Sequence, residues 1–252
     1  NFNKKDTGVA ALKVLKKNGV EVQEAYPGCC GMPFLEQADL PKVVEQAAEG
    51  CQSIVHMAFV NGTEFFYSKP ELVLEVGVKG MINVLDACRS QQIGDLILIS
   101  SSEVYQEPPT IPTPEDVPLI IPDIHNPRYS YGGGKIISEL LALNYGRKDF
   151  ERIVIIRPHN VFGPDMGWEH VIPQFILRAH DSIQEQPNGP INFPIQGKGT
   201  ETRSFVYIDD FTEGLALAIE KGKHQEIYHV GTEEELTIAK VAKKIVTAFG
   251  RE

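Results

Sequence analysis

The stretch DLILIS, residues 95–100, decides the fold class of this chain. Its apolar residues follow one another without alternation, which is typical of a strand covered on both faces of a parallel sheet. Short runs of the same kind, SIVHMA at 53–58 and RIVIIR at 152–157, are separated from it by helical patterns at about 69–91 and 130–147. This order predicts an α/β fold with a doubly wound, Rossmann-like parallel sheet.

Further segments complete the predicted domain, which we place at residues 48–252. Residues 158–205 are rich in proline and glycine, so we expect them to be loop-rich and to form most of a smaller substrate-binding lobe. A strand at 227–230 and a helix from 237 to 249 follow. This C-terminal part is expected to contribute to the same lobe.

The composition favours one folded domain and argues against two classes of partner. The 252 residues are 42% hydrophobic and 23% charged, which is enough to bury one substantial core. The formal net charge is −10 and the pI is about 5.2, so the average surface repels nucleic-acid phosphates and anionic lipid. We therefore expect neither nucleic acid nor a membrane as a partner.

Two further features bear on the compartment. No run approaches the roughly 20 apolar residues that a membrane span requires, and the first residues, NFNKKDTG, contain no apolar signal core. The four cysteines, at 29, 30, 51 and 88, are expected to stay reduced, because adjacent cysteines rarely satisfy disulfide geometry. We predict a cytoplasmic protein, without a metal in its site.

The sequence YGGGK, residues 131–135, places a phenol and an ammonium four residues apart within a helical pattern. On a helix they share one face, so Lys135 can stabilise a Tyr131 phenolate that takes a proton from a hydroxyl. An ordinary exposed pair is the alternative, since this spacing is common. The three glycines favour the first interpretation, because each costs a helix about 1 kcal/mol relative to alanine and the close approach of a ligand or backbone would explain them.

The strand at 95–100 runs directly into SSSEVY, residues 100–105. Ligands of open α/β sheets bind at the carboxyl ends of the strands, so a serine hydroxyl here can meet the phenol of Tyr131. The alternative is that these serines cap the next turn.

From about residue 51 to 252 the chain resembles the extended short-chain dehydrogenase/reductases, the NAD-dependent sugar epimerase/dehydratase family. Six motifs carry this resemblance in the order that the family has them. They are IVHMA (54–58), SSSEVY (100–105), YGGGK (131–135), RPHNVFGP (157–164), TRSFVYIDD (202–210) and IYHVG (227–231).

The resemblance implies an enzyme that modifies a nucleotide sugar by transient hydride transfer to NAD or NADP. Its catalytic triad would be Ser101, Tyr131 and Lys135. The cofactor would be lined by His56, Ala58, Ser100, Tyr131, Lys135 and Pro158, and the nucleotide-sugar substrate would be held by Ser102, Asn160 and Arg203. For Arg203 the physical reason is direct, because a guanidinium matches the geometry of phosphate oxygens; a surface ion pair with Asp209 or Asp210 is the alternative.

Glu103 bears on the reaction type, because a carboxylate beside the catalytic hydroxyl can remove a proton next to a transient ketone or assist a decarboxylation. The family's 4,6-dehydratases usually have Thr-Asp-Glu where this chain has Ser101-Ser102-Glu103. Ser102 cannot supply the acid that expels water, so dehydration is disfavoured. The Ser-Glu pair is similar to the family's uronate decarboxylases, whereas simple 4-epimerases need no carboxylate. We favour an epimerase, and a decarboxylase or a dehydratase is the alternative.

The chain departs from the family pattern in three places. The Gly-rich turn TGxxGxxG that holds the dinucleotide pyrophosphate is missing, since only Thr7 and Gly8 match it, and the first βαβ unit is therefore atypical. Gly77 and His229 each stand where an asparagine is usual.

Residues 1–47 instead resemble the CCG cysteine-rich module of anaerobic iron-sulfur oxidoreductase subunits, in which Cys29 and Cys30 would be cluster ligands. A cluster usually needs about four thiolates, so this chain by itself is not expected to bind one. The alternative to the enzyme is thus a chimeric protein that is non-catalytic or related to iron-sulfur electron transfer and lacks dinucleotide binding.

The resemblance also implies a homodimer, because extended members of the family pair through helices that correspond to residues 69–91 and 130–147. Apolar side chains on these helices have an alternative role, which is to pack on the chain's own sheet. They are Met81, Val84, Leu85, Leu140 and Leu141.

Overall fold

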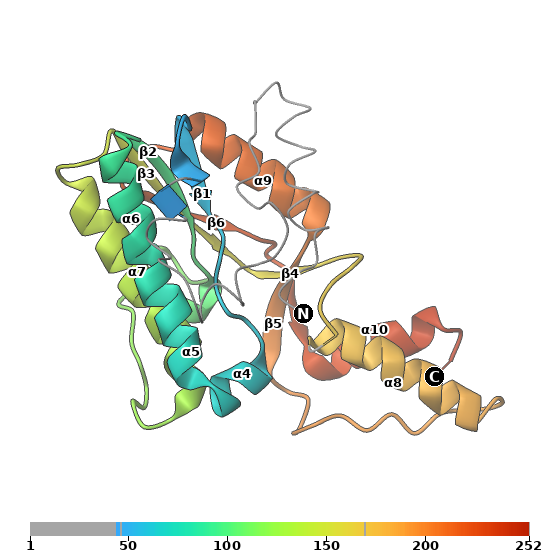
Figure 1. Cartoon of the computed structure of the whole chain (residues 1–252). Helices are drawn as coiled ribbons and strands as arrows, with labels where there is room; N and C mark the ends of the chain where they lie inside the picture. Colours follow the sequence, from blue (N-terminus) through green and yellow to red (C-terminus); the bar gives the residue numbers. More distant parts are fainter. Residues whose placement is uncertain (1–43, 46, 169, 252) are drawn as a thin grey trace.

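The computed structural model describes residues 44–251, except 46 and 169 (Figure 1). The segment 1–43, which includes Cys29 and Cys30 of the predicted module, lies outside the described residues.

A four-stranded parallel sheet forms the centre of the described chain, in the spatial order β1-β2-β3-β6 (Figure 1). The strands are β1 (Ser53–His56), β2 (Asp95–Ile99), β3 (Arg152–Pro158) and β6 (Glu226–Val230). Every neighbouring pair is parallel, with Ile97 of β2 opposite Val55 and Val154. The apolar runs therefore form the sheet that the sequence predicts, and the Rossmann-like α/β fold is confirmed.

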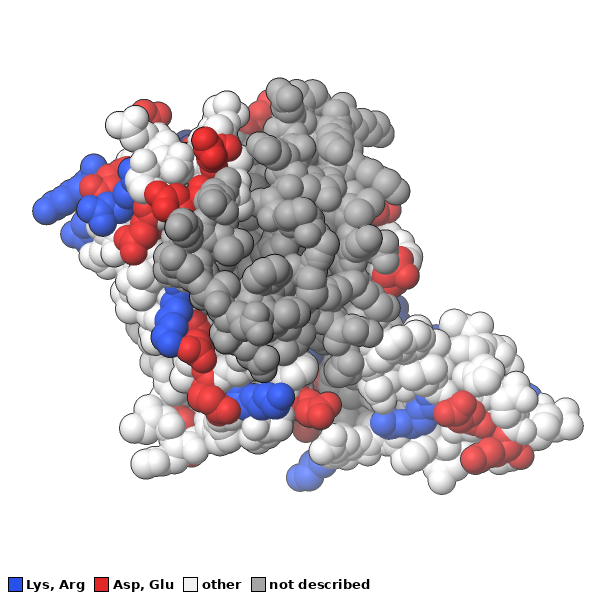
Figure 2. Space-filling view, viewed as in Figure 1, with Lys and Arg blue, Asp and Glu red and all other residues white. Residues whose placement is uncertain are grey.

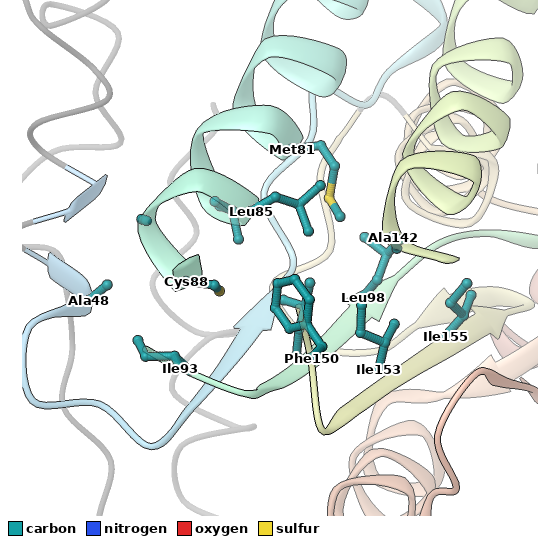
Figure 3. Close-up of a cluster of buried hydrophobic side chains, with 13 residues drawn as sticks. Ala48, Met81, Leu85, Cys88, Ile93, Leu98, Ala142, Phe150, Ile153 and Ile155 are labelled. Carbon is teal, nitrogen blue, oxygen red and sulfur yellow. The ribbon is translucent and has the colours of Figure 1, made fainter. Parts of the chain in front are cut away.

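Helices cover both faces of this sheet, which explains why its strands are apolar throughout. Helices α6 (Gly80–Ser90) and α7 (Ser130–Gly146) lie on one face, and α9 (Ile208–Lys221) lies on the other (Figure 1). Side chains alternate between the two faces along β2 and β3, and Figure 3 shows the cluster under α6 and α7. Leu96, Leu98, Ile153 and Ile155 belong to the first cluster, and Ile97, Ile99, Val154 and Ile156 to the second.

The helix expected at about 69–91 is present but is not uniform. It begins as α5 (Pro70–Leu74), widens to one π-helical turn, η1 (Glu75–Lys79), and continues as α6. Such turns are rare and are found frequently at functional sites. Gly77 lies in the middle of this turn.

The segment expected to be loop-rich, 158–205, contains more regular structure than the sequence suggested. It holds β4 (Asn160–Phe162), α8 (Val171–Glu185) and the start of β5 (Thr202–Tyr207). Pro173 lies within the first turn of α8, where a missing N–H costs nothing, so the proline did not signal the end of a helix. Strand β7 (Glu235–Thr237) pairs with β5, and α10 (Ile238–Ala248) packs against α8.

Short elements connect these layers at the carboxyl edge of the sheet. They are α4 (Thr63–Ser68), η2 (Ser102–Val104) and η3 (Pro127–Tyr129). On the face drawn in Figure 2, Lys and Arg side chains are interspersed with Asp and Glu. None of the helices in the described part of the chain has both the length and the apolarity to cross a bilayer.

The apolar residues of the two helices expected at a dimer contact divide into two groups. Met81, Val84 and Leu85 are buried in the chain's own core, and Leu141 packs against it, so the alternative role holds for these residues. Leu140 on α7 is 56% exposed. The homodimer stays a prediction. Among the cysteines, Cys51 and Cys88 are free thiols, as expected.

A buried ion pair connects α7 to β3. Arg157 and Glu139 are each 2% exposed, and the guanidinium donates two hydrogen bonds to the carboxylate, of 2.9 and 2.6 Å. The Ser100 hydroxyl donates to the same carboxylate at 2.5 Å. Because an isolated buried charge is costly, each member of this group depends on the others.

We expect Glu139→Leu to lower the free energy of unfolding by about 3–5 kcal/mol, because it leaves the Arg157 guanidinium buried without a counter-charge. Urea denaturation followed by circular dichroism measures this change. Glu220→Leu, at an exposed position of α9, is the control and should change stability by less than about 0.5 kcal/mol. Equal effects of the two substitutions would contradict a special role for the buried pair.

Candidate active site

The carboxyl ends of three neighbouring strands converge on one region of the sheet edge. His56 ends β1, Ser101 follows β2 and Pro158 ends β3. Helix α7 starts beside them and contributes Tyr131 and Lys135 from its first two turns. The structure thus brings the predicted triad to the edge at which ligands of open α/β sheets bind.

Tyr131 is nearly covered by aromatic rings. Its side chain is 7% exposed, with the Phe59 ring edge-on at a centroid distance of 5.1 Å and the Phe66 ring stacked at 5.3 Å. Burial raises the pKa of Tyr131 to about 12, and a hydrogen bond with the Ser101 side chain acts in the opposite direction. The phenol therefore needs a nearby positive charge if it is to lose its proton near neutral pH.

Lys135 lies near Tyr131 on the same face of α7, as the spacing predicts. It is 3% exposed, and its Nζ donates a 2.7 Å hydrogen bond to the Ile99 carbonyl oxygen at the end of β2. Nζ lies 4.3 Å from the centroid of the Phe59 ring and 5.8 Å from that of Tyr131. Burial lowers the pKa of Lys135 to about 7, although the charge of Glu139 opposes this shift.

The glycines between these residues allow close approach, as their presence in a helix suggested. A Cβ at Gly132 would lie 2.8 Å from the carbonyl oxygen of Glu103, and a Cβ at Gly134 would lie 2.8 Å from the Phe59 ring. Both distances are shorter than non-bonded atoms tolerate. Helix α7 can therefore approach η2 and Phe59 only because side chains are missing here.

The serines after β2 serve different partners. Ser101 caps η2, since its Oγ accepts a 3.1 Å hydrogen bond from the Glu103 backbone N–H, so the capping alternative also holds for this residue. Ser102 is half-buried in the first position of η2. The Ser100 hydroxyl donates to Glu139, and the expected contact of Ser100 with the cofactor stays a prediction.

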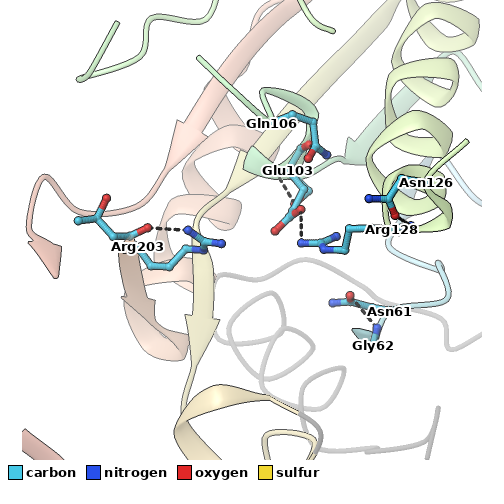
Figure 4. Close-up of polar contacts among 9 residues, drawn as sticks. Asn61, Gly62, Glu103, Gln106, Asn126, Arg128 and Arg203 are labelled. Atoms are coloured by element: carbon cyan, nitrogen blue, oxygen red, sulfur yellow. Dashed lines mark hydrogen bonds and ion pairs between the residues drawn. The ribbon is translucent and has the colours of Figure 1, made fainter. Parts of the chain in front are cut away.

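Glu103 forms an ion pair with Arg128, a residue that the sequence analysis did not single out. The Arg128 Nη2 lies 3.0 Å from Glu103 Oε2, and Figure 4 shows the two groups pointing toward one another. The Arg128 guanidinium also lies over the Phe66 ring, 5.2 Å from its centroid. Its other terminal nitrogen, Nη1, is buried and has no hydrogen-bond partner among the described residues.

The predicted substrate residues lie on the strands of the lobe. Asn160 begins β4, and its side-chain amide donates to the Ser204 carbonyl at 2.9 Å. Arg203 is exposed on β5, with one N–H donating to the Thr202 carbonyl at 2.7 Å (Figure 4). Ala58, expected beside the cofactor, is exposed in the loop after β1.

His229 on β6 belongs to a chain of polar contacts that leads into the core. Its Nε2 lies 2.5 Å from the Tyr105 hydroxyl, and its Nδ1 lies 3.4 Å from the half-exposed carboxylate of Glu115. The Tyr105 hydroxyl in turn accepts a 2.5 Å hydrogen bond from Arg157. Burial lowers the pKa of His229 despite the nearby Glu115 carboxylate.

His56 is buried beside Lys135 at the end of β1, and it is neutral over most of the pH range. Burial, followed by the charge of Lys135, lowers its pKa to about 3. In the unfolded chain a histidine titrates at about 6.5. The folded protein therefore binds this proton far more weakly than the unfolded chain does.

We expect this difference to make stability fall with acidification. The contribution of neutral His56 to the free energy of unfolding is complete above about pH 6.5. It is lost as the pH falls toward 3, at up to about 1.4 kcal/mol per pH unit. His56→Gln should have a correspondingly shallower pH dependence in urea denaturation between pH 6.5 and 4.5. His180→Gln, at an exposed position, is the control; parallel curves for His56→Gln and the wild type would contradict the assignment.

Fold and site together define a Rossmann-like enzyme with a hydroxyl, a phenol and an ammonium at its ligand-binding edge. The family model described as "NAD dependent epimerase/dehydratase family" matches residues 3–231, and the chain belongs to this family. The match begins well before residue 51, where the resemblance was expected to start. It includes the segment interpreted as an iron-sulfur module, so that interpretation is not borne out.

Similar proteins act on nucleotide sugars. The chain is 29% identical over 213 residues to a dTDP-glucose 4,6-dehydratase of Streptomyces antibioticus. The aligned region covers 84% of this chain and 59% of the relative. It is 26% identical to dTDP-4-dehydro-6-deoxy-D-allose reductase of Streptomyces bikiniensis, covering 86% of this chain and 65% of that protein. The chain thus spans less than two thirds of the length of these relatives.

Solved structures give the same picture of the fold. DesIV, a dTDP-glucose 4,6-dehydratase of Streptomyces venezuelae solved with NAD bound, matches with a TM-score of 0.71 and 26% identity, covering 84% of this chain and 62% of that one. TunA, described as an NAD-dependent NDP-hexosamine 5,6-dehydratase, matches with a TM-score of 0.77 at 21% identity and covers 97% of this chain and 78% of its own. At that identity the likeness to TunA concerns the fold.

Proposed function

We propose that the protein is an NAD(P)-dependent enzyme that epimerises a nucleotide sugar through transient oxidation of one of its hydroxyl groups. One observation carries this proposal. The Ser101 hydroxyl, the Tyr131 phenol and the Lys135 ammonium meet at the carboxyl edge of a parallel sheet, and family membership supplies the cofactor class.

The residues present fit the nicotinamide end of the cofactor. Lys135 has three N–H groups, of which one is bound by the Ile99 carbonyl, so the ammonium retains donors for ribose hydroxyls. Pro158 ends β3 and Ala58 is exposed in the loop after β1, and in this proposal both offer an apolar border for the nicotinamide ring. When bound, the cofactor supplies the acceptor for a hydride from the sugar.

Tyr131 acts as the general base in this proposal. Its phenolate accepts the proton of the sugar hydroxyl while the hydride leaves the same carbon, and the ketone that results is reduced from its opposite face with return of the proton from Tyr131. Lys135 stabilises the phenolate by its charge, and the Ser101 hydroxyl donates a hydrogen bond to the reacting oxygen. The rings of Phe59 and Phe66 exclude water from the phenol, which strengthens both interactions.

The lobe supplies the proposed anchor for the nucleotide diphosphate. Arg203 on β5 presents an exposed guanidinium, Asn160 begins the neighbouring strand β4, and the two strands pair in parallel. Ser102 offers a hydroxyl to the sugar from η2. The buried Nη1 of Arg128 provides a further donor for a substrate oxygen.

Epimerisation is favoured over dehydration although dehydratases are among the relatives. Ser102 stands beside the Ser101 hydroxyl and has no proton acidic enough to expel water from the sugar. The carboxylate of Glu103 is already engaged in an ion pair with Arg128, so it is not free to act on the sugar in place of the missing acid. Decarboxylation of a uronic acid sugar is the second outcome that this Ser-Glu pair allows.

We expect Tyr131→Phe to lower kcat by about 10²- to 10⁴-fold, because the general base is lost. NADH should bind with a dissociation constant within about threefold of the wild type, because the substitution removes only one hydroxyl. Turnover of UDP-glucose and dTDP-glucose, and NADH fluorescence, are the measurements. Tyr129→Phe, at a half-buried position of η3, is the control. Unchanged turnover in Tyr131→Phe, or no NADH binding by the wild type, would refute the proposal.

The mass of the product distinguishes the reactions. Epimerisation by transfer of one hydride away from the sugar and back leaves the product mass unchanged and incorporates no deuterium from ²H₂O, because the hydrogen on carbon never exchanges with solvent. Mass spectrometry of the sugar product in both solvents makes this test. Loss of the mass of water would identify a dehydratase, and loss of carbon dioxide a decarboxylase.

A further inference from the structure

Phe59, in the loop between β1 and α4, occupies a space that two helices leave for it. A Cβ built on Gly77 would lie 2.1 Å from the Phe59 ring, and a Cβ on Gly134 would lie 2.8 Å from it. Atoms cannot approach so closely, so the ring lies in this place only because both positions are glycine. Gly77 is the position at which the family's usual asparagine is missing, and the ring fills the volume beside it.

The local backbone supports this arrangement. Gly77 lies at the centre of the π-helical turn, where one extra residue widens the helix, and its surface is buried. Gly134 lies on α7, one residue before Lys135. The ring thus lies between two helical segments that pack against each other.

The group that the ring faces is the ammonium of Lys135. Nζ lies 4.3 Å from the centroid of the Phe59 ring, well within the range of about 6 Å for a cation–π interaction. The same ring meets Tyr131 with its planes at 80°, at a centroid distance of 5.1 Å. Phe59 therefore contacts both side chains between which charge must be shared when the phenol loses its proton.

We propose that Phe59 is a positioning residue for Lys135, which holds the ammonium charged and in place beside Tyr131 through the face of its ring. The catalytic meaning of this role rests on the proposed function, whereas the contact itself does not. Water is largely excluded from Nζ, and the Ile99 carbonyl accepts one of its hydrogen bonds. The negative face of the ring replaces part of the lost hydration without accepting a proton.

Two other titratable groups, Glu139 and His56, interact electrostatically with Lys135. Glu139, one turn further along α7, raises the pKa of Lys135, and the charge of Lys135 lowers that of His56 on β1. Glu139 is bound by Arg157 and Ser100, and a substitution at Phe59 removes neither of these partners. The effect of Phe59 can therefore be measured against a constant background.

Nuclear magnetic resonance of protein with ¹³C-labelled lysine tests the proposal on the protein without cofactor. The Cε and Hε signals of Lys135, assigned with Lys135→Arg, should show the upfield shift that an aromatic face produces. Phe59→Leu should abolish this shift and lower the pKa of Lys135 by about 0.5 to 1 pH unit, because burial stays and the ring face is lost. An unchanged ring shift or pKa in folded Phe59→Leu would overturn the proposal.

Two glycine substitutions provide a matched pair that leaves Phe59 in the sequence. Gly77→Ala should displace the ring and reduce the upfield shift of Lys135, whereas Gly80→Ala, three residues along the same helix with no atom within 4 Å of the added Cβ, should not. In the background of Phe59→Ala, Gly77→Ala should have little further effect on the Lys135 signals, because the clash is removed. Equal effects of Gly77→Ala in the two backgrounds would contradict the arrangement.

Binding of NADH separates this inference from the proposed function. At pH 8, Phe59→Leu should weaken NADH binding about three- to tenfold, because a smaller share of Lys135 is charged. If the wild type binds no NADH while the Lys135 signals respond as expected, the proposed function fails and the positioning role of Phe59 stands. Wild-type-like NADH binding together with unchanged Lys135 signals in Phe59→Leu would reject the role.

Discussion

The rest of the site depends on the buried ion pair between Arg157 and Glu139. It fixes α7 against β3 along the sheet, because the two-pronged contact permits one relative position of helix and strand. Glu139 lies one turn after Lys135, so the same contact determines how far Lys135 reaches toward the end of β2. Removal of two charges from water is costly, so the pair persists only while each charge keeps the other as its partner.

The parts that sequence alone could predict are those in which a local pattern and the global fold agree. Uninterrupted apolar runs such as 95–100 have few other uses than a covered parallel strand, and YGGGK places Tyr131 and Lys135 on one helix face in any helical conformation. The composition of 158–205 predicted loops, whereas the structure has α8 there. A proline in the first turn of a helix looks, in sequence, the same as one that ends it.

The remaining features depend on contacts between distant segments, which no local pattern encodes. Phe59 and Gly77 are 18 positions apart in the chain, and neither alone signals that one fills the space of the other. Arg128 became part of the site only because η3 and η2 lie together at the start of α7. The start of the family match was also predicted too late, because the expected glycine-rich turn is the strongest local signal and its loss obscured the weaker similarity around it.

The contacts of Tyr105 have a direction. A guanidinium only donates hydrogen bonds, so the Tyr105 oxygen must accept from Arg157 and its own hydrogen must point outward to His229 Nε2. That in turn places the ring hydrogen of neutral His229 on Nδ1, facing Glu115. One obligate donor in the interior thus sets the tautomer of a partly exposed histidine. Both ring nitrogens of neutral His229 are then engaged, Nδ1 by its own hydrogen and Nε2 by the hydrogen of Tyr105, so protonation of His229 requires the Tyr105 hydroxyl to turn away.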